Sequence, residues 1–322
     1  MEKRPRHEKL NLIGCCAELI SPVLSSRSCV TYELTESPVS MTDGGSAKIA
    51  GYNYQRRMKL SIVIPAYNEA RTIEAILDRI NEAVSDFHEV VVVDDASSDE
   101  TANLVRKRAA DDSRIHLLQH ERNSGKTAAL RTGFAAVTGD IVVIQDADLE
   151  YDPADILDLI APIIENRGDV CLGSRFLVKR AGRVLYYRHY LANRFLTFLN
   201  NVLTDLNFTD VETGYKAMRA DIARRMIISS TGFGFEVEFI AKCQKAGFRF
   251  YEVPISYFGR TYEEGKKITF MDGLAAIYFI LKFNLFATRK SSFREQEFRS
   301  SGVQGEEPGA RIQESEGGNA QD

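Results

Sequence analysis

Short apolar runs rich in valine and isoleucine alternate with helical patterns through the middle of the chain. The runs LSIVIP, EVVVVDD, IHLLQ, DIVVIQ and DVCLGSR begin at residues 60, 89, 115, 140 and 169. Between them lie segments such as EARTIEAILDRINEAV, in which Ile73, Ile76, Leu77 and Ile80 form one apolar stripe. Continuous apolar strands separated by such helices predict an α/β fold: a Rossmann-like, mostly parallel sheet flanked by helices on both faces.

The composition divides the chain into three zones. Residues 1–57 mix Ser, Thr, Gly and polar residues without a steady period, and residues 289–322 are polar and rich in glycine. Both segments are expected to be mostly disordered, the first as an N-terminal extension and the second as a C-terminal tail. Residues 58–288 are therefore expected to form the folded domain.

Bulk properties exclude several classes of protein. A net charge of −4 over 322 residues gives no reason to expect nucleic acid as a partner, and the five cysteines form neither a CxxC pair nor an evenly spaced framework. A reducing cytoplasm is the expected location. The apolar segment 270–287 is interrupted by Asp272 and Lys282, so it falls short of the roughly 20 apolar residues of a spanning helix. Glu18 interrupts the apolar stretch near the N-terminus, which argues against a signal peptide.

Polar, charged and small residues follow each of the five predicted strands. The strand ends read PAYNE, DDASSDE, HERNSGK, QDADLE and GSRF. Ligands of open parallel sheets bind at the carboxyl ends of the strands, so these segments are expected to form one continuous site. Within it, Asp146, Asp148, Glu150 and Asp152 fall within seven residues. Like charges this close repel one another, so the cluster is interpreted as a metal site, an acid/base pair or a solvated acidic surface loop.

One candidate class is the magnesium-dependent P-loop NTPases. Gly125, Lys126 and Thr127 follow a strand and open a helix, and VVIQDADLE resembles the acidic strand end that holds magnesium in that class. The phosphate loop needs GxxxxGK[ST], however, and the position of its first glycine holds His120. A Rossmann dinucleotide site is weaker still, because no GxGxxG follows any of these strands.

A second class accounts for more of the chain. The blocks SIVIPAYNEARTI, VVVDDASSDET, NSGKTAALRTGF, DADLE, GSRF, DVETGYKAMRADI, GFGFEVEFIAKCQKAGFRFYEVPISY and GRTYEEGKKITFMDG occur in this order. With these blocks, residues 58 to about 287 resemble the family-2 glycosyltransferases of the GT-A type, and in particular the dolichyl-phosphate and polyprenyl-phosphate hexosyltransferases. The resemblance implies a metal-dependent, inverting transfer of a hexose from a nucleoside-diphosphate sugar to a polyprenyl or dolichyl phosphate.

The resemblance also implies a donor side of the site. Asp146 and Asp148 would bind Mg²⁺ or Mn²⁺ and the sugar nucleotide, with Glu150 as a further metal ligand. Such a cation prefers carboxylate oxygens and stabilises a departing diphosphate as a Lewis acid. Asp152 precedes Pro153 and suits a helix N-cap better than a metal ligand.

The nucleotide pocket is expected at the first two strand ends. The resemblance implies that six residues line the pocket for the base and ribose: Pro65, Ala66, Tyr67, Asn68, Glu69 and Asp95. Asp94 and Asp99 could equally be structural. Lys126, at the start of a helix, is expected to help bind the diphosphate, because a cation and backbone N–H groups together favour an anion.

The acceptor side decides the subclass. The resemblance implies that Arg175, Arg188 and Arg260 bind the acceptor phosphate, with Lys266 adding charge at the rim; the arginine fork suits phosphate oxygens. Asp146, Asp148, Arg175 and Arg260 are the expected catalytic set. The closest alternative is transfer to a hydroxyl of a saccharide or lipid, which needs a general base from Asp210 or Glu212. A sugar-nucleotide-binding protein without activity is a remote alternative, against which the intact DADLE and arginine positions argue.

Two segments combine aromatic, aliphatic and basic residues as interfacial helices do: YYRHYLANRFLTFLNNVL at 186–203 and FMDGLAAIYFILKFNLFA at 270–287. Packing against the sheet is the alternative explanation for each. Peripheral contact with the cytoplasmic face of a membrane is therefore expected, without a spanning helix.

Overall fold

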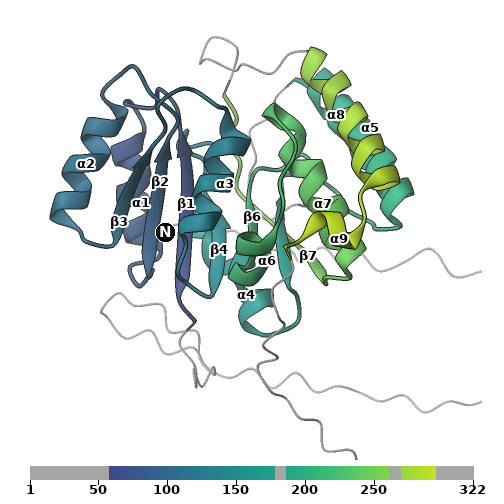
Figure 1. The fold of residues 1–322 in the computed structure, drawn as a ribbon, viewed down its shortest axis with the longest axis horizontal. Coiled ribbons are helices and arrows are strands. Elements are labelled where there is room, and N and C mark those ends of the chain that lie inside the picture. Colours follow the sequence, from purple (N-terminus) through teal and green to yellow (C-terminus); the bar gives the residue numbers. More distant parts are fainter. Residues whose placement is uncertain (1–57, 178–185, 261–269, 295–322) are drawn as a thin grey trace, which may run out of the picture. The chain divides into compact units, whose positions relative to one another are not determined.

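A seven-stranded sheet lies at the centre of the part of the chain that the computed structural model describes, which is residues 58–177, 186–260 and 270–294 (Figure 1). Its strand order is β3-β2-β1-β4-β6-β5-β7, and every neighbouring pair is parallel except the two that involve β6. The strands are β1 (Leu60–Ala66), β2 (Glu89–Asp94), β3 (Ile115–Gln119), β4 (Ile141–Ile144), β5 (Val170–Ser174), β6 (Lys216–Arg219) and β7 (Phe250–Pro254).

Helices cover both faces of the sheet (Figure 1). The α-helices are α1 (Ile73–Ala83), α2 (Thr101–Asp111), α3 (Lys126–Ala136), α4 (Ile156–Ile164), α5 (Tyr187–Thr204), α6 (Ala220–Arg225), α7 (Phe235–Ala246), α8 (Phe270–Phe286) and α9 (Arg289–Ser292). Two 3₁₀ turns, η1 (Pro153–Asp155) and η2 (Gly232–Gly234), precede α4 and α7. The five predicted strands and the helix predicted within residues 69–84 are confirmed, with ends that differ by a few residues.

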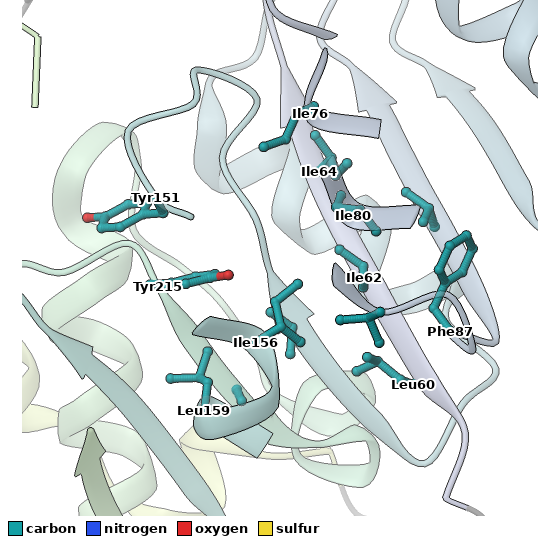
Figure 2. Close-up of a cluster of buried hydrophobic side chains, with 14 of the residues drawn as sticks. Leu60, Ile62, Ile64, Ile76, Ile80, Phe87, Tyr151, Ile156, Leu159 and Tyr215 are labelled. Atoms are coloured by element: carbon teal, nitrogen blue, oxygen red, sulfur yellow. The ribbon is translucent and has the colours of Figure 1, made fainter. Parts of the chain in front are cut away.

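The alternation of side chains along the central strands places apolar residues on both faces. Ile62 and Ile64 of β1 lie in one core cluster with residues of α1 and α4, whereas Val63 lies in the other with residues of α3 and α7. Figure 2 shows the first cluster, in which Ile76 and Ile80 of α1 face β1. The strands read as continuous apolar runs because both faces are buried.

The helices α5 and α8 pack against each other and against α7 rather than on the sheet (Figure 1). Leu196 of α5, Val237 of α7, and Ala276 and Ile280 of α8 form a small separate core. This leaves the outer sides of α5 and α8 exposed. Among the described residues, no helix has the length and apolar character needed to cross a bilayer.

The folded chain extends beyond the predicted boundary at residue 288. Thr288 caps α9, and Phe293 is 8% exposed, pairs with Met226 and packs edge-on against Phe248. Residues 289–294 therefore belong to the domain, because burial of Phe293 ties this polar segment to the α7 side of the core. The predictions for residues 1–57 and for the tail after Arg294 lie outside the described residues.

Gly133 of α3 tests the contact between this helix and the sheet. A Cβ at Gly133 would collide with the side chain of Val63 on β1 and touch that of Val93 on β2. Gly133→Ala should therefore lower the free energy of unfolding by about 1–3 kcal/mol, the usual cost of overpacking a core. Denaturant titration of Gly133→Ala and of the unaltered chain measures this difference in the free energy of unfolding.

Gly273→Ala is the matched control, because a Cβ at Gly273 of α8 would meet no atom within 4 Å. It should leave stability unchanged or raise it by up to about 1 kcal/mol through helix propensity. Equal effects of the two substitutions would contradict the described packing of α3.

Candidate active site at the carboxyl edge of the sheet

The polar strand ends meet at one edge of the sheet, as predicted. The backbone N–H of Asn68, after β1, donates to Ser97 Oγ at 2.9 Å, and the N–H of Ser98 donates to Asn68 Oδ1 at 2.8 Å. Lys126 of α3 reaches Asp146 after β4, and Arg260, after β7, reaches Asp148. Segments that lie more than 100 residues apart in the chain therefore form one connected site.

The first predicted pocket residues differ in accessibility. Tyr67 is 41% exposed, and Asn68 adopts the left-handed backbone with φ 55° that turns the chain after β1. Ala66 is buried in the core, so its side chain does not face a ligand, and its carbonyl accepts from the N–H of Asp95 at 2.8 Å. Pro65 is half-buried, and Glu69 begins the turn into α1 by accepting from Thr72 Oγ1 at 3.0 Å.

Asp95 is satisfied within the protein. It is 2% exposed and accepts from the N–H groups of Ser124 at 2.9 Å and Gly125 at 2.6 Å, which precede α3. His120 lies 2.6 Å from Asp95 through Nδ1 and 2.9 Å from Thr132 Oγ1 through Nε2. An aspartate thus occupies two backbone donors of the segment before α3, which a P-loop would offer to phosphate.

The neighbouring Asp94 is bound less completely. It is 1% exposed, and its Oδ2 accepts from the Ser97 N–H at 3.3 Å and from Gln119 at 3.4 Å. Its Oδ1 has no hydrogen-bond partner in the described part of the chain. A buried acceptor of this kind costs free energy because no donor meets it.

Asp146 is paired with Lys126. The Lys126 Nζ lies 2.7 Å from Asp146 Oδ1 and 2.9 Å from Oδ2, and Glu236 of α7 lies 3.9 Å away. Burial opposes the charge of Lys126, but the two carboxylates outweigh it and raise the pKa of the lysine above its ordinary value. Lys126 therefore remains charged and contributes its ammonium to this edge of the sheet.

Asp148 is the carboxyl of the acidic turn whose pKa is raised. Burial, together with the charges of Asp146 and Glu150, raises the pKa of Asp148 to about 6. Arg260 offsets part of this effect, because its Nη2 donates to Asp148 Oδ2 at 2.7 Å. Asp152 is not part of this set: its Oδ1 accepts from the Ala154 N–H at 3.0 Å and caps η1, which confirms the predicted N-cap.

Glu150 is bound to the segment that follows β7. Its Oε2 accepts from the Tyr257 hydroxyl at 2.8 Å, and its Oε1 accepts from the Arg260 N–H at 2.9 Å. Burial and the charge of Glu150 raise the pKa of Tyr257, so the phenol remains a donor. No group of three or more His, Cys, Asp or Glu side chains in the described ranges could hold a metal ion. The binding of one cation by Asp146, Asp148 and Glu150 together stays a prediction.

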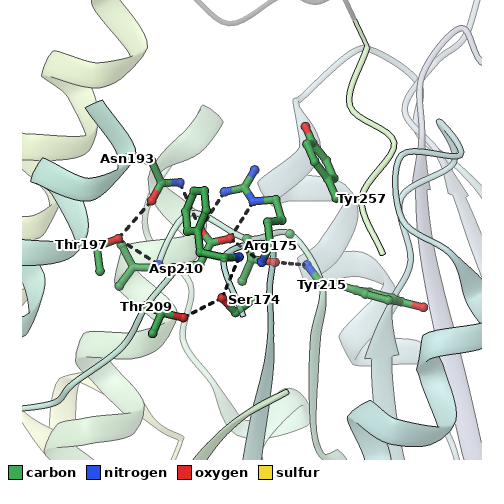
Figure 3. Close-up of polar contacts among 12 residues, drawn as sticks. Ser174, Arg175, Asn193, Thr197, Thr209, Asp210, Tyr215 and Tyr257 are labelled. Atoms are coloured by element: carbon green, nitrogen blue, oxygen red, sulfur yellow. Dashed lines mark hydrogen bonds and ion pairs between the residues drawn. The ribbon is translucent and has the colours of Figure 1, made fainter. Parts of the chain in front are cut away.

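Arg175 is held by a buried carboxylate (Figure 3). Its Nε and Nη2 donate to the two oxygens of Asp210, each at 2.7 Å, and Asn193 of α5 donates to the same carboxylate at 3.0 Å. Burial would raise the pKa of Asp210, but Arg175 holds it below its usual range. The guanidinium also lies 5.2 Å from the ring centroid of Tyr257, and 16% of the Arg175 side chain is exposed. Arg175 thus forms a rigid, partly accessible cation.

Two further residues are predicted to contribute to binding of the acceptor phosphate, Arg188 and Lys266. Arg188 lies exposed in the first turn of α5, and Lys266 lies outside the described residues. Burial and then the charge of Glu236 raise the pKa of Glu212 to about 8.

The sequence did not single out Tyr257 or Asn193. The available signal was an aromatic residue three positions after β7 and an amide in α5.

Residues 61–227, more than half of the chain, match the family model described as Glycosyl transferase family 2. The chain belongs to this family. It is 31% identical to the undecaprenyl-phosphate mannosyltransferase of Micrococcus luteus over 219 residues, which are 65% of this chain and 87% of that relative. It is 27% identical to the dolichol-phosphate mannosyltransferase of Pyrococcus furiosus over 233 residues, 70% of this chain, and spans 64% of that longer relative.

A solved structure of glucosyl-3-phosphoglycerate synthase from Mycobacterium tuberculosis matches the fold with a TM-score of 0.55 at 21% identity, over 71% of this chain and 80% of that one. The predicted GT-A fold is thereby confirmed. This family-2 glycosyltransferase places its acidic turn and its arginines at the carboxyl edge of the sheet, where open α/β sheets bind their ligands.

The raised pKa of Asp148 predicts a pH-dependent effect of Asp148→Asn on the metal-free enzyme. A carboxyl whose pKa rises from 3.8 to about 6 on folding destabilises the fold while it is charged, and asparagine mimics its neutral form. In the presence of a chelator at pH 7.5, Asp148→Asn should raise the free energy of unfolding by about 1–3 kcal/mol. The gain should shrink as the pH falls through 6 and vanish below pH 4.

Urea titration at pH 7.5 and at the lowest pH that keeps the protein folded measures this difference. Asp111→Asn, an exposed carboxylate on α2, is the control and should change stability by less than about 0.5 kcal/mol at either pH. A loss of stability in Asp148→Asn at pH 7.5 would show that the Arg260 pair outweighs the repulsion.

Proposed function

We propose that this glycosyltransferase moves a hexose from a nucleoside-diphosphate sugar to a polyprenyl or dolichyl phosphate. The names of its relatives from Micrococcus luteus and Pyrococcus furiosus support a lipid-phosphate acceptor. The observation that carries the proposal is the position of Arg260, whose guanidinium contacts Asp148 and Glu150 directly. A phosphate-binding cation thus lies against the acids proposed for the donor side, as transfer between two anionic substrates requires.

The donor side fits a hard divalent cation. Asp146 and Asp148 offer carboxylate oxygens. Burial and the neighbouring negative charges raise the pKa of Asp148, and bound positive charge would offset both effects. Magnesium often takes only one or two protein carboxylates and completes its shell with water and substrate phosphate, so a set of three protein ligands is not needed. When bound, the cation supplies Lewis-acid stabilisation of the departing diphosphate. The structural neighbour from Mycobacterium tuberculosis was solved with Mn²⁺ and uridine-diphosphate.

The chain's own residues provide charge and position. Lys126 adds an ammonium beside Asp146, where the diphosphate of the donor would lie. Tyr67 and Asn68 contribute exposed groups to the nucleoside pocket. Arg175 and Arg260 would hold the acceptor phosphate, whose oxygen attacks the anomeric carbon as the bond to the diphosphate breaks. An ionised phosphate needs no general base, so positioning and electrostatics supply the catalysis.

The two carboxyls considered as a base for a hydroxyl acceptor are poorly suited to that role. Asp210 is fully buried and accepts from Arg175 and Asn193, and its lowered pKa makes it a weak proton acceptor. Glu212, with a pKa of about 8, is mostly protonated at neutral pH. These two environments favour a phosphate acceptor over a hydroxyl acceptor.

We also propose that α5 and α8 form a membrane-facing surface. Each helix exposes apolar side chains at positions i, i+4, i+7 and i+11, and the two helices pack side by side. These residues are Leu191, Phe195, Phe198 and Val202 on α5, and Leu274, Tyr278, Leu281 and Leu285 on α8. Contiguous apolar stripes of this kind suit the headgroup region of a bilayer, where a lipid acceptor resides.

Transfer assays with radiolabelled donors test the acceptor class. With a panel of UDP- and GDP-hexoses and Mg²⁺ or Mn²⁺, the chain should label a short-chain polyprenyl phosphate and leave the matching polyprenol unlabelled. Asp148→Asn should reduce turnover by about a hundredfold or more, because a metal contributes several kcal/mol. Labelling of the polyprenol or of free saccharides alone would refute the phosphate acceptor.

Vesicle sedimentation tests the membrane surface. The double substitution Phe198→Asp and Leu281→Asp should weaken binding to vesicles of phosphatidylcholine and phosphatidylglycerol at least about tenfold, because each buried side chain is worth about 1.5–3 kcal/mol. Leu157→Asp is the control, since Leu157 is similarly exposed but lies on α4. Equal binding of the double variant and the unaltered chain would contradict the proposed surface.

A further inference from the structure

The segment from Tyr257 to Arg260 makes several of its hydrogen bonds to the acidic turn at one residue, Glu150. The Phe258 N–H donates to the Glu150 carbonyl at 2.8 Å. The Tyr257 hydroxyl donates to Oε2 at 2.8 Å, and the Arg260 backbone donates to Oε1 at 2.9 Å. Tyr257 also pairs with Tyr151, the next residue of the turn, as an antiparallel bridge. Glu150 therefore receives donors at its main-chain oxygen and at both side-chain oxygens.

Tyr257 also contacts the other acceptor arginine. The Arg175 guanidinium lies 5.2 Å from the centroid of the Tyr257 ring, within the range of a cation–π contact. Figure 3 shows Tyr257 beside Arg175, on the side away from Asn193. The ring of Tyr257 thus contacts Arg175. Its hydroxyl contacts Glu150, the carboxylate that binds Arg260.

We infer that Tyr257 is a positioning residue that sets the spacing between Arg175 and Arg260 for an acceptor phosphate. The inference rests on the proposed function, in which both guanidinia bind one phosphate group. Arginine loses considerable side-chain entropy when it is immobilised, so a site built from two arginines gains affinity if both are held in place beforehand. Asp210 holds Arg175, and Glu150 with Asp148 holds Arg260.

The hydroxyl of Tyr257 fixes the orientation of Glu150. Without this donor, Oε2 loses its hydrogen bond, and the carboxylate gains freedom to rotate about its terminal bond. The same rotation moves Oε1, which accepts from the backbone N–H and the Nε of Arg260 at 2.9 and 3.4 Å. The positive charge of Arg260 stays in the site, but its direction is no longer fixed. Acceptor binding should therefore suffer more than donor binding.

Tyr257→Phe tests this role because it removes the hydroxyl and keeps the ring under Arg175. The KM for a short-chain polyprenyl phosphate should rise about tenfold, the value of one hydrogen bond to a charged group. The KM for the sugar nucleotide should stay within about twofold, and the melting temperature within about 5 °C. Tyr257→Leu, which also removes the ring, should raise the acceptor KM further.

Tyr215→Phe is the matched control. The Tyr215 hydroxyl belongs to the same aromatic group, with its ring 5.1 Å from that of Tyr151, but it donates to the carbonyl of Asp152 at 3.0 Å and not to Glu150. Its removal should leave the ratio of acceptor to donor KM unchanged. A purely structural role of Tyr257 would lower stability and kcat in Tyr257→Phe without altering that ratio.

The experiments distinguish a failure of the proposed function from a failure of the positioning role of Tyr257. Absence of transfer to polyprenyl phosphate by the unaltered chain would overturn the proposed function, and this inference with it. Transfer by the unaltered chain, combined with an unchanged acceptor KM in Tyr257→Phe, would overturn the inference alone. Isothermal titration of the same polyprenyl phosphate, without donor, should show the same roughly tenfold loss of affinity and so separates binding from turnover.

Discussion

The site depends on the neutralisation of the three carboxylates after β4. Asp146, Asp148 and Glu150 lie close together and partly buried at the end of an apolar strand, and burial together with the charges of its two neighbours raises the pKa of Asp148. Lys126 offsets the charge of Asp146, and Arg260 offsets that of Asp148 and Glu150. These pairs join α3 and the segment after β7 to the acidic turn.

The three cations of the site have different carboxylate partners. Lys126 is bound to Asp146 on the proposed donor side, whereas Arg175 is bound to the fully buried Asp210. Arg260 contacts Asp148 and Glu150, so charge added at these acids acts on it directly. A phosphate acceptor suits this arrangement because it meets fixed guanidinia and needs no proton acceptor.

The sequence predicts the architecture well where burial is complete. The central runs that form β1, β2, β4 and β5 are buried on both faces, so their composition alone marks them as strands. The four residues of β6 include Lys216 and are too short to show a period, and β6 is the strand that runs antiparallel to its neighbours. Phe293 falls in the predicted tail because its neighbours are polar, yet its burial extends the domain to Arg294.

The contacts of a single residue can be predicted from the sequence only where its partners are close by in the chain. The Asp152 cap depends on the next two residues and was predicted, whereas the partners of Asp95 and Glu150 come from segments about 30 and 110 residues away. No pattern near Asp95 indicates that it binds the amides before α3, or that Glu150 would be occupied by Tyr257 and Arg260. Such contacts are set by loop conformations that propensities do not encode.

The most direct test of the central claim is the position of a cation at this edge. Crystals grown with Mn²⁺ and a nucleoside diphosphate would reveal the metal by its anomalous scattering. The account predicts a peak within coordination distance of Asp146 or Asp148, with Glu150 still bonded to Tyr257. A peak remote from both aspartates, or one coordinated by Glu150 after its release from Tyr257, would contradict the assigned division between donor-side acids and acceptor-side support.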